Sequence, residues 1–251
     1  MDHLVDHPAL SQTEHRPWPL PKRPWTWRQT WHDLLFLHWP VDASTLQPLV
    51  PQPLEIHHYA GSAWVGVTPF WMSGVMLRNW PALPWLSHFP ELNVRTYVTF
   101  RGKPGVWFFS LDAGNRLAVT VARRRFHLPY VHARMRVRQV EERVEYRSVR
   151  GDGTTFEASY GPIAPSVRSE PGSLDHWLTE RYRLYAVSPS GSLNETEIHH
   201  APWPLQEASA TIVRNDMLEV LGIRVTGEAP HVRFARRLDV VVWSLEPVRE
   251  G

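Results

Sequence analysis

The segment of residues 89–97 carries four polar side chains whose types could bind and convert a small molecule. It reads FPELNVRTY, and in an extended strand alternate side chains share one face. Glu91, Asn93, Arg95 and Tyr97 would then point the same way. Arg95 could hold a carboxylate through two parallel hydrogen bonds, and Glu91 could move a proton. A Glu–Arg ion pair on a solvated sheet face fits the pattern equally well, so the segment alone leaves both interpretations open.

Two histidine pairs, His57-His58 and His199-His200, raise the question of a metal site, because imidazole is a common metal ligand. Neighbouring side chains on a strand point to opposite faces, so each pair offers only one ligand to any one site. We therefore expect structural or hydrogen-bonding roles and no metal. The turn at residues 201–204, Ala-Pro-Trp-Pro, follows directly and would hold Trp203 at the rim of a pocket.

Residues 116–150 contain ten arginines against three glutamates, a balance that could suit phosphate groups. The same residues also fit a solvated helix end and strand face, since cations at a helix C-terminus complement its dipole. The formal net charge is only +2. A nucleic-acid partner is therefore not expected.

Composition excludes several classes of protein. The chain has no cysteine, which removes disulfides, thiolate nucleophiles and thiolate zinc sites. It has no apolar run long enough to span a bilayer and no apolar leader in its first 25 residues, so we expect a cytoplasmic protein with no membrane partner. The signatures of mononucleotide loops, dinucleotide folds, zinc peptidases and nucleophile elbows are missing as well.

The patterning predicts one mostly β, α+β domain over residues 25–251, preceded by a proline- and histidine-rich extended or disordered tail at 1–24. Helices are expected from Asp42 or Ser44 to about Leu49, from Asn115 to Arg125, and over Leu174–Tyr182 behind Ser173. Expected strands cover residues 31–39, 54–59, 63–70, 93–100, 106–111, 134–138, 144–149 and 232–243.

Taken together, nine segments of this chain resemble the YqjF-like family, a domain of unknown function. The resemblance extends from about Trp25 to the C-terminus, and no single motif carries it. The segments are LLFLHWPV at 34–41, AWVG at 63–66, ELNVRTYV at 91–98, GVWFFSLD at 105–112, ARR at 122–124, LPY at 128–130, LTERYRLY at 178–185, IHH at 198–200 and WPL at 203–205.

This family is distantly similar to acetoacetate decarboxylase, and the similarity implies a curved, cone-like antiparallel barrel around a pocket, with a few crossing helices. In those enzymes the turn after one helix supplies a Schiff-base lysine. The resembling turn here places Tyr130 at that position, and a phenol cannot form the iminium that such chemistry needs. The two lysines, Lys22 and Lys103, lie in the tail and in a turn, so acetoacetate decarboxylation is not expected. Glu91 resembles the pocket glutamate of the relatives.

Two hypotheses for function follow. In the first, the pocket binds a small organic acid or carbonyl compound without converting it. In the second, it belongs to a lysine-independent lyase, isomerase or hydratase that uses Glu91 as general acid or base. The predicted catalytic residues are Glu91 and Tyr130, no cofactor is expected, and the sequence is compatible with a homo-oligomer. The predicted ligand-binding residues are Asn93, Arg95, Tyr97, Trp107, Phe109, Arg124, His199 and Trp203.

Overall fold

The computed structural model describes residues 7–80, 87–225 and 229–248, and its architecture is dominated by one 13-stranded sheet. The strands are β1 (Trp27–Val41), β2 (Glu55–Ile56), β3 (Ala63–Leu77), β4 (Phe89–Phe100), β5 (Lys103–Ala113), β6 (Tyr130–Val140), β7 (Arg143–Arg150), β8 (Thr155–Pro162), β9 (Arg183–Val187), β10 (Leu193–His200), β11 (Gln206–Asn215), β12 (His231–Val242) and β13 (Glu246–Pro247).

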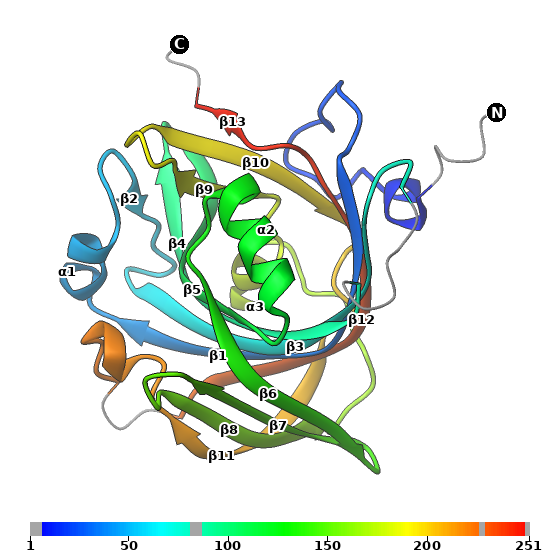
Figure 1. Cartoon of the computed structure of the whole chain (residues 1–251), viewed down its shortest axis with the longest axis vertical. Helices are drawn as coiled ribbons and strands as arrows, with labels where there is room; N and C mark the ends of the chain where they lie inside the picture. Colours follow the sequence, from blue (N-terminus) through cyan, green and yellow to red (C-terminus); the bar gives the residue numbers. More distant parts are fainter. Residues whose placement is uncertain (1–6, 81–86, 226–228, 249–251) are drawn as a thin grey trace.

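The sheet closes partly into a ring. Its strand order is β13-β10-β9-β5-β6-β7-β8-β11-β12-β1-β3-β4-β2, and the additional pairings β10–β12 and β5–β4 link β1, β3, β4, β5, β9, β10 and β12 into a circle. Strands β6, β7, β8 and β11 leave this circle as a second layer (Figure 1). Most pairs are antiparallel, as predicted, but β5 pairs in parallel with both β6 and β9. The result is ring-like, yet it is not a simple closed barrel.

Three α-helices accompany the sheet in the described residues: α1 (Ala43–Leu46), α2 (Arg116–Phe126) and α3 (Leu174–Thr179). Short 3-10 turns lie at Pro8–Ser11, Gln47–Leu49 and Glu219–Leu221. Helix α2 lies across the ring in Figure 1. None of these helices is long and apolar enough to cross a membrane.

Helix α2 begins and ends as its sequence predicts. The side chain of Asn115 accepts hydrogen bonds from the amides of Leu117 and Ala118, which satisfies two of the free amides at the helix start. His127 then adopts the left-handed conformation with φ 51°, which ends the helix and turns the chain into β6. Helix α3 is shorter than predicted: it ends at Thr179, Glu180 leaves the helical conformation with ψ 69°, and the carbonyl of Tyr182 already accepts a hydrogen bond from the amide of Ile198.

Two glycines in the strands allow large side chains of the neighbouring strand to lie over them. A Cβ on Gly66 would lie 2.7 Å from Cδ2 of His38, and a Cβ on Gly105 would lie 2.6 Å from Cε2 of Tyr185. The side-chain rings of His38 and Tyr185 are both fully buried. These contacts give a physical reason for glycine within two of the segments that suggested the family resemblance.

Residues 7–24 pack against the ring and are not an unattached tail. Leu10 and Leu20 contact the buried cluster of Trp25, Val241 and Trp243. The side chain of Arg16, 1% exposed, donates to the carbonyl of Ile198 in β10. Composition alone does not reveal this attachment, because the anchoring residues are single side chains among prolines.

Candidate functional site

A cavity of about 380 Å³ lies inside the ring, between the strands and α2. Most of its wall is apolar, as is usual for pockets that take small molecules. The polar side chains of the lining come from β3, β4, β6, β9, β10, the last residue of α3 and the segment between α3 and β9. They are Thr68, Glu91, Asn93, Arg95, Tyr130, Thr179, Arg181, Arg183 and His200, with Gln29 from β1.

Glu91 and Tyr130 form a hydrogen-bonded pair in this cavity. The phenol of Tyr130 donates to Oε2 of Glu91 at 3.0 Å. Burial raises the pKa of Glu91 to about 8, although the hydrogen bond from Tyr130 acts in the opposite direction. At neutral pH the carboxyl is therefore mostly protonated, and its proton is available to a ligand.

The backbone around Glu91 is fixed from behind by the second layer. The phenol of Tyr146 in β7 donates to the carbonyl of Glu91 at 2.7 Å and contacts that of Phe70 at 3.1 Å. Nearby, Arg150 binds the buried carboxylate of Asp112 through Nε and Nη2, at 3.0 and 2.7 Å. These contacts join β7 to β3, β4 and β5, so the backbone of Glu91 is held in place by hydrogen bonds from the second layer.

Arg181 brings a buried positive charge to the cavity. Its Nε donates to the carbonyl of Trp177 at 2.6 Å, and its Nη1 contacts Nδ1 of His57 at 3.1 Å. Its Nη2 is buried and has no hydrogen-bond partner among the described residues. Burial lowers the pKa of Arg181 to about 10, and the positive charge of Arg95 contributes to this shift. At neutral pH the guanidinium of Arg181 remains charged.

Arg95 is the second cation of the cavity, and aromatic rings hold it. Its guanidinium lies 5.5 Å from the ring centre of Phe36 and 5.8 Å from that of Tyr97. Its Nε is buried without a hydrogen-bond partner in the described part of the chain. Within those same residues, neither Arg95 nor Arg181 lies within ion-pair distance of a carboxylate.

Further polar atoms of cavity-lining residues are buried and without a hydrogen-bond partner in the described structure, among them Oδ1 of Asn93, Oγ1 of Thr68 and Nε2 of His200. Nδ1 of His200 contacts the carbonyl of Ala201 at 2.8 Å. A carbonyl can only accept, so Nδ1 carries the hydrogen and Nε2 of the neutral ring is an acceptor. The residues that line the cavity therefore carry both donors and acceptors that have no partner in the described part of the chain.

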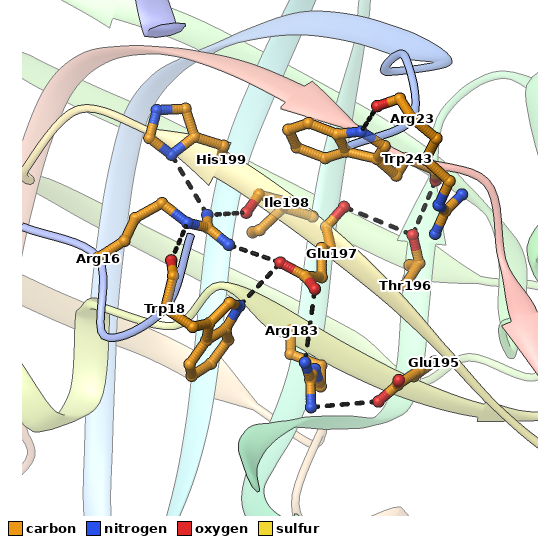
Figure 2. Close-up of polar contacts among 10 residues, drawn as sticks. All are labelled: Arg16, Trp18, Arg23, Arg183, Glu195, Thr196, Glu197, Ile198, His199 and Trp243. Atoms are coloured by element: carbon orange, nitrogen blue, oxygen red, sulfur yellow. Dashed lines mark hydrogen bonds and ion pairs between the residues drawn. The ribbon is translucent and has the colours of Figure 1, made fainter. Parts of the chain in front are cut away.

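Arg183 also lines the cavity, but its charge is already neutralised. Figure 2 shows it between Glu195 and Glu197 of β10, with which it forms ion pairs of 3.2 and 3.4 Å. Glu197 in turn binds Nη2 of Arg16 at 2.6 Å and Nε1 of Trp18 at 2.8 Å. This network attaches the N-terminal residues to the strand whose Ile198 and His200 line the cavity.

The structure brings together five of the residues predicted from sequence: Glu91, Asn93, Arg95, Tyr130 and Trp203 all line the cavity. Trp203 is buried, and its Nε1 donates to the carbonyl of Thr179 at 2.8 Å. Tyr97, in contrast, lies outside the lining, where its hydroxyl contacts Nε2 of His38 at 2.6 Å.

Trp107 and Phe109 were predicted to contact the ligand, but the structure places them outside the cavity, and Phe108 lines it instead. They pack against the main hydrophobic core. The reason is a bulge in β5 at Phe109, where the pairing with β4 moves from Val94–Ser110 to Arg95–Phe108. The strand therefore presents Val106, Phe108 and Leu111 to the cavity, an order that simple alternation does not predict.

Arg124 and His199 also lie away from the cavity lining. Arg124 is exposed on α2, and His199 contacts Arg16 on the outer side of β10 while its neighbour His200 faces inward. Sequence reasoning missed Arg181, Thr68, His200 and Phe108. For Arg181 a signal existed, since it lies in the segment LTERYRLY, but it was assigned to a helix.

Comparison of the fold identifies the architecture as that of acetoacetate decarboxylase. The acetoacetate decarboxylase of Legionella pneumophila subsp. pneumophila str. Philadelphia 1 superposes with a TM-score of 0.66, over 94% of this chain and 93% of that one, at 12% identity. The enduracididine biosynthesis enzyme MppR complexed with pyruvate gives a TM-score of 0.62, covers 94% of both chains and is 11% identical. At such identities the likeness shows the fold alone.

Sequence comparison identifies the family. The model of DUF2071, described as an uncharacterized conserved protein, matches residues 28–239, so the chain belongs to this family. The uncharacterized protein YqjF of Bacillus subtilis (strain 168) is 46% identical over 223 residues, which cover 88% of this chain and 92% of that protein. The family resemblance inferred from the nine segments is confirmed.

Proposed function

We propose that this protein binds a small organic acid in the cavity, with the carboxylate on Arg95 and Arg181. The observation that carries the proposal is the pair of guanidiniums of Arg181, which is buried, and Arg95, which is half-buried with a buried Nε; neither has a carboxylate partner in the described residues. A buried charge without a counterion is costly, so an anion that enters the cavity would offset that cost. The free Nε of Arg95 and Nη2 of Arg181 are donors of the type that carboxylates accept.

Glu91 supports the same proposal. Because its pKa is raised to about 8, it stays mostly neutral at pH 7 and does not repel an anionic ligand. The solved complex of MppR with pyruvate offers a parallel for a small acid in this fold.

The proposal is tested by calorimetric titration of the purified protein with a panel of monocarboxylates, from acetate and pyruvate to octanoate. Removing a charged hydrogen bond costs about 1.5–3 kcal/mol, so Arg181→Met and Arg95→Met should each weaken binding about tenfold or more. Arg125→Met is the matched control, because Arg125 is exposed on α2 and outside the cavity lining. If no acid binds, or if all three variants bind as tightly as the unmodified protein, the proposal is wrong.

A second candidate is a lysine-independent lyase, isomerase or hydratase, and the Glu91–Tyr130 pair favours it. A carboxyl with a pKa of about 8 is suited to give and take a proton near neutral pH. The test is deuterium incorporation into 4-oxopentanoate in D2O, followed by proton NMR. Exchange above the uncatalysed rate that Glu91→Gln abolishes, with acid binding retained, supports catalysis, whereas equal exchange in both proteins rules Glu91 out as the base.

A further inference from the structure

We propose that the acid bound in this cavity carries an apolar chain or ring, which lies along β3 toward α2. This inference rests on the proposed function and adds the class of ligand. It depends on how polar and apolar side chains are distributed along the cavity.

The pairing of β3 with β4 orders the lining side chains. Along β4 the cavity meets Arg95, Asn93, Glu91 and then Phe89, whose partners on β3 are Gly66, Thr68, Phe70 and Met72. At about 3.3 Å per residue, the backbones of Arg95 and Glu91 are about 13 Å apart. Arg181 lies near Arg95, because both guanidiniums contact the ring of Tyr97, at 4.9 and 5.8 Å from its centre. The two arginines mark one end of the cavity, called here the arginine end, and Glu91 lies farther along.

Beyond Phe89 the wall is mostly apolar, with Gln29 of β1 as a polar member. β3 continues with Val75, Met76 and Leu77, all of which line the cavity, and α2 faces them with Ala118 and Val121. Phe126 of α2 lies 5.8 Å from Trp27 of β1, ring centre to ring centre, and closes this part of the wall. We call this region the apolar end.

Exposure differs between the two ends. At the apolar end Val121 is 44% exposed and Trp80 is 66% exposed, and both line the cavity. At the arginine end Arg181 is 7% exposed and Thr68 is 1% exposed. The buried charge attracts a carboxylate, and the apolar side chains that remain in contact with water leave an unfilled surface for a hydrocarbon group.

An acid as small as acetate or pyruvate would occupy the arginine end and leave the apolar end unfilled. Each additional methylene that moves from water onto this wall contributes about 0.8 kcal/mol, which is about a fourfold gain in affinity. A ligand that extends from the arginine end also passes Glu91 and Tyr130. A proton transferred there would therefore reach an atom several bonds from the carboxylate.

The test is calorimetry of the full chain with acetate, butyrate, hexanoate, octanoate and phenylacetate, and with hexan-1-ol as the uncharged control. We expect the Kd to fall about fourfold per methylene up to the length that fills the wall, and hexan-1-ol to bind at least about tenfold more weakly than hexanoate. If acids bind through Arg181 with an affinity that does not change with chain length, the proposed function stands and this inference is wrong. If no acid binds, both are wrong.

A pair of α2 variants tests where the hydrocarbon chain of the ligand lies. Val121→Glu places a charge at the apolar end and should weaken octanoate binding at least about tenfold while leaving acetate within about twofold. Leu117→Glu is the matched control, because Leu117 is an exposed apolar residue of the same helix that does not line the cavity. Equal octanoate affinity in both variants would contradict the inferred position of the chain.

Discussion

The phenol of Tyr130 donates a hydrogen bond to Oε2 of Glu91 across 3.0 Å inside the cavity. The pair is held from behind by Tyr146, which binds the backbone carbonyl of Glu91. Both groups are neutral at pH 7, because burial raises the pKa of each. Because Glu91 and Tyr130 carry no charge, they do not repel the carboxylate of an incoming acid. Arg95 and Arg181 are the groups that can neutralise that carboxylate.

The raised pKa of Glu91 makes stability depend on pH. Between about pH 4.5 and about pH 8 the folded protein keeps a proton on Glu91 that the unfolded chain releases, so the free energy of unfolding falls as pH rises through this window. Glu91→Gln has no such proton and should show a smaller fall. Urea unfolding at about pH 5 and about pH 8 measures both slopes, and equal slopes would contradict the assigned burial of the carboxyl.

The cavity lining contains no lysine among the described residues, which predicts that no imine forms in the cavity. Lys22 and Lys103 are both exposed and neither lines the cavity. Incubation with pyruvate and borohydride, followed by mass spectrometry of peptides, should therefore find no reduced adduct on a cavity residue. Acetoacetate should likewise not be decarboxylated above the spontaneous rate. An adduct on either lysine that an excess of hexanoate suppresses would contradict this expectation.

Gly66 is required by the ring of His38. An added Cβ would lie 2.7 Å from Cδ2 of that ring, which is fully buried and held by the hydroxyl of Tyr97. Gly66→Ala should therefore lower the free energy of unfolding by about 1–3 kcal/mol through overpacking. Gly151→Ala is the control, because nothing lies within 4 Å of its Cβ position. Chemical unfolding compares the two variants. Equal free energies of unfolding would show that the imidazole ring of His38 can move aside without a loss of stability.

Much of the fold follows from the sequence, and the exceptions have physical causes. The alternation at residues 134–138 and the cap at Asn115 predicted β6 and α2, since both patterns are local. The parallel pairing of β5 with β9 and β6 could not be predicted in this way, because it joins segments that are distant along the chain.

Among the strand residues proposed from sequence, the cavity lining follows simple alternation only where the strand is regular. Glu91, Asn93 and Arg95 alternate along β4 and do line the cavity. In β5 the bulge at Phe109 shifts the alternation, so Phe108 faces inward where Trp107 and Phe109 were expected. Arg181 lies in an irregular segment after α3, where no periodicity indicates which way a side chain points.

The attachment of residues 7–24 predicts unequal costs for two arginine substitutions. Arg16, 1% exposed, binds Glu197, and breaking a buried pair costs about 3 kcal/mol or more. Arg147 binds Glu157 on the surface, where both side chains are about half exposed and a pair is worth about 0–1 kcal/mol. Urea unfolding of Arg16→Met and Arg147→Met compares them. Similar small losses would show that the N-terminal residues add little to the stability of the ring.

The most direct test of the bound acid is a crystal structure of the protein grown with hexanoate. We expect the carboxylate oxygens within hydrogen-bond distance of Nε of Arg95 and Nη2 of Arg181, and the chain directed past Glu91 toward Val121. Hexanoate bound in the reverse direction, or a cavity that holds no hexanoate at a concentration that saturates the protein in solution, would contradict the account.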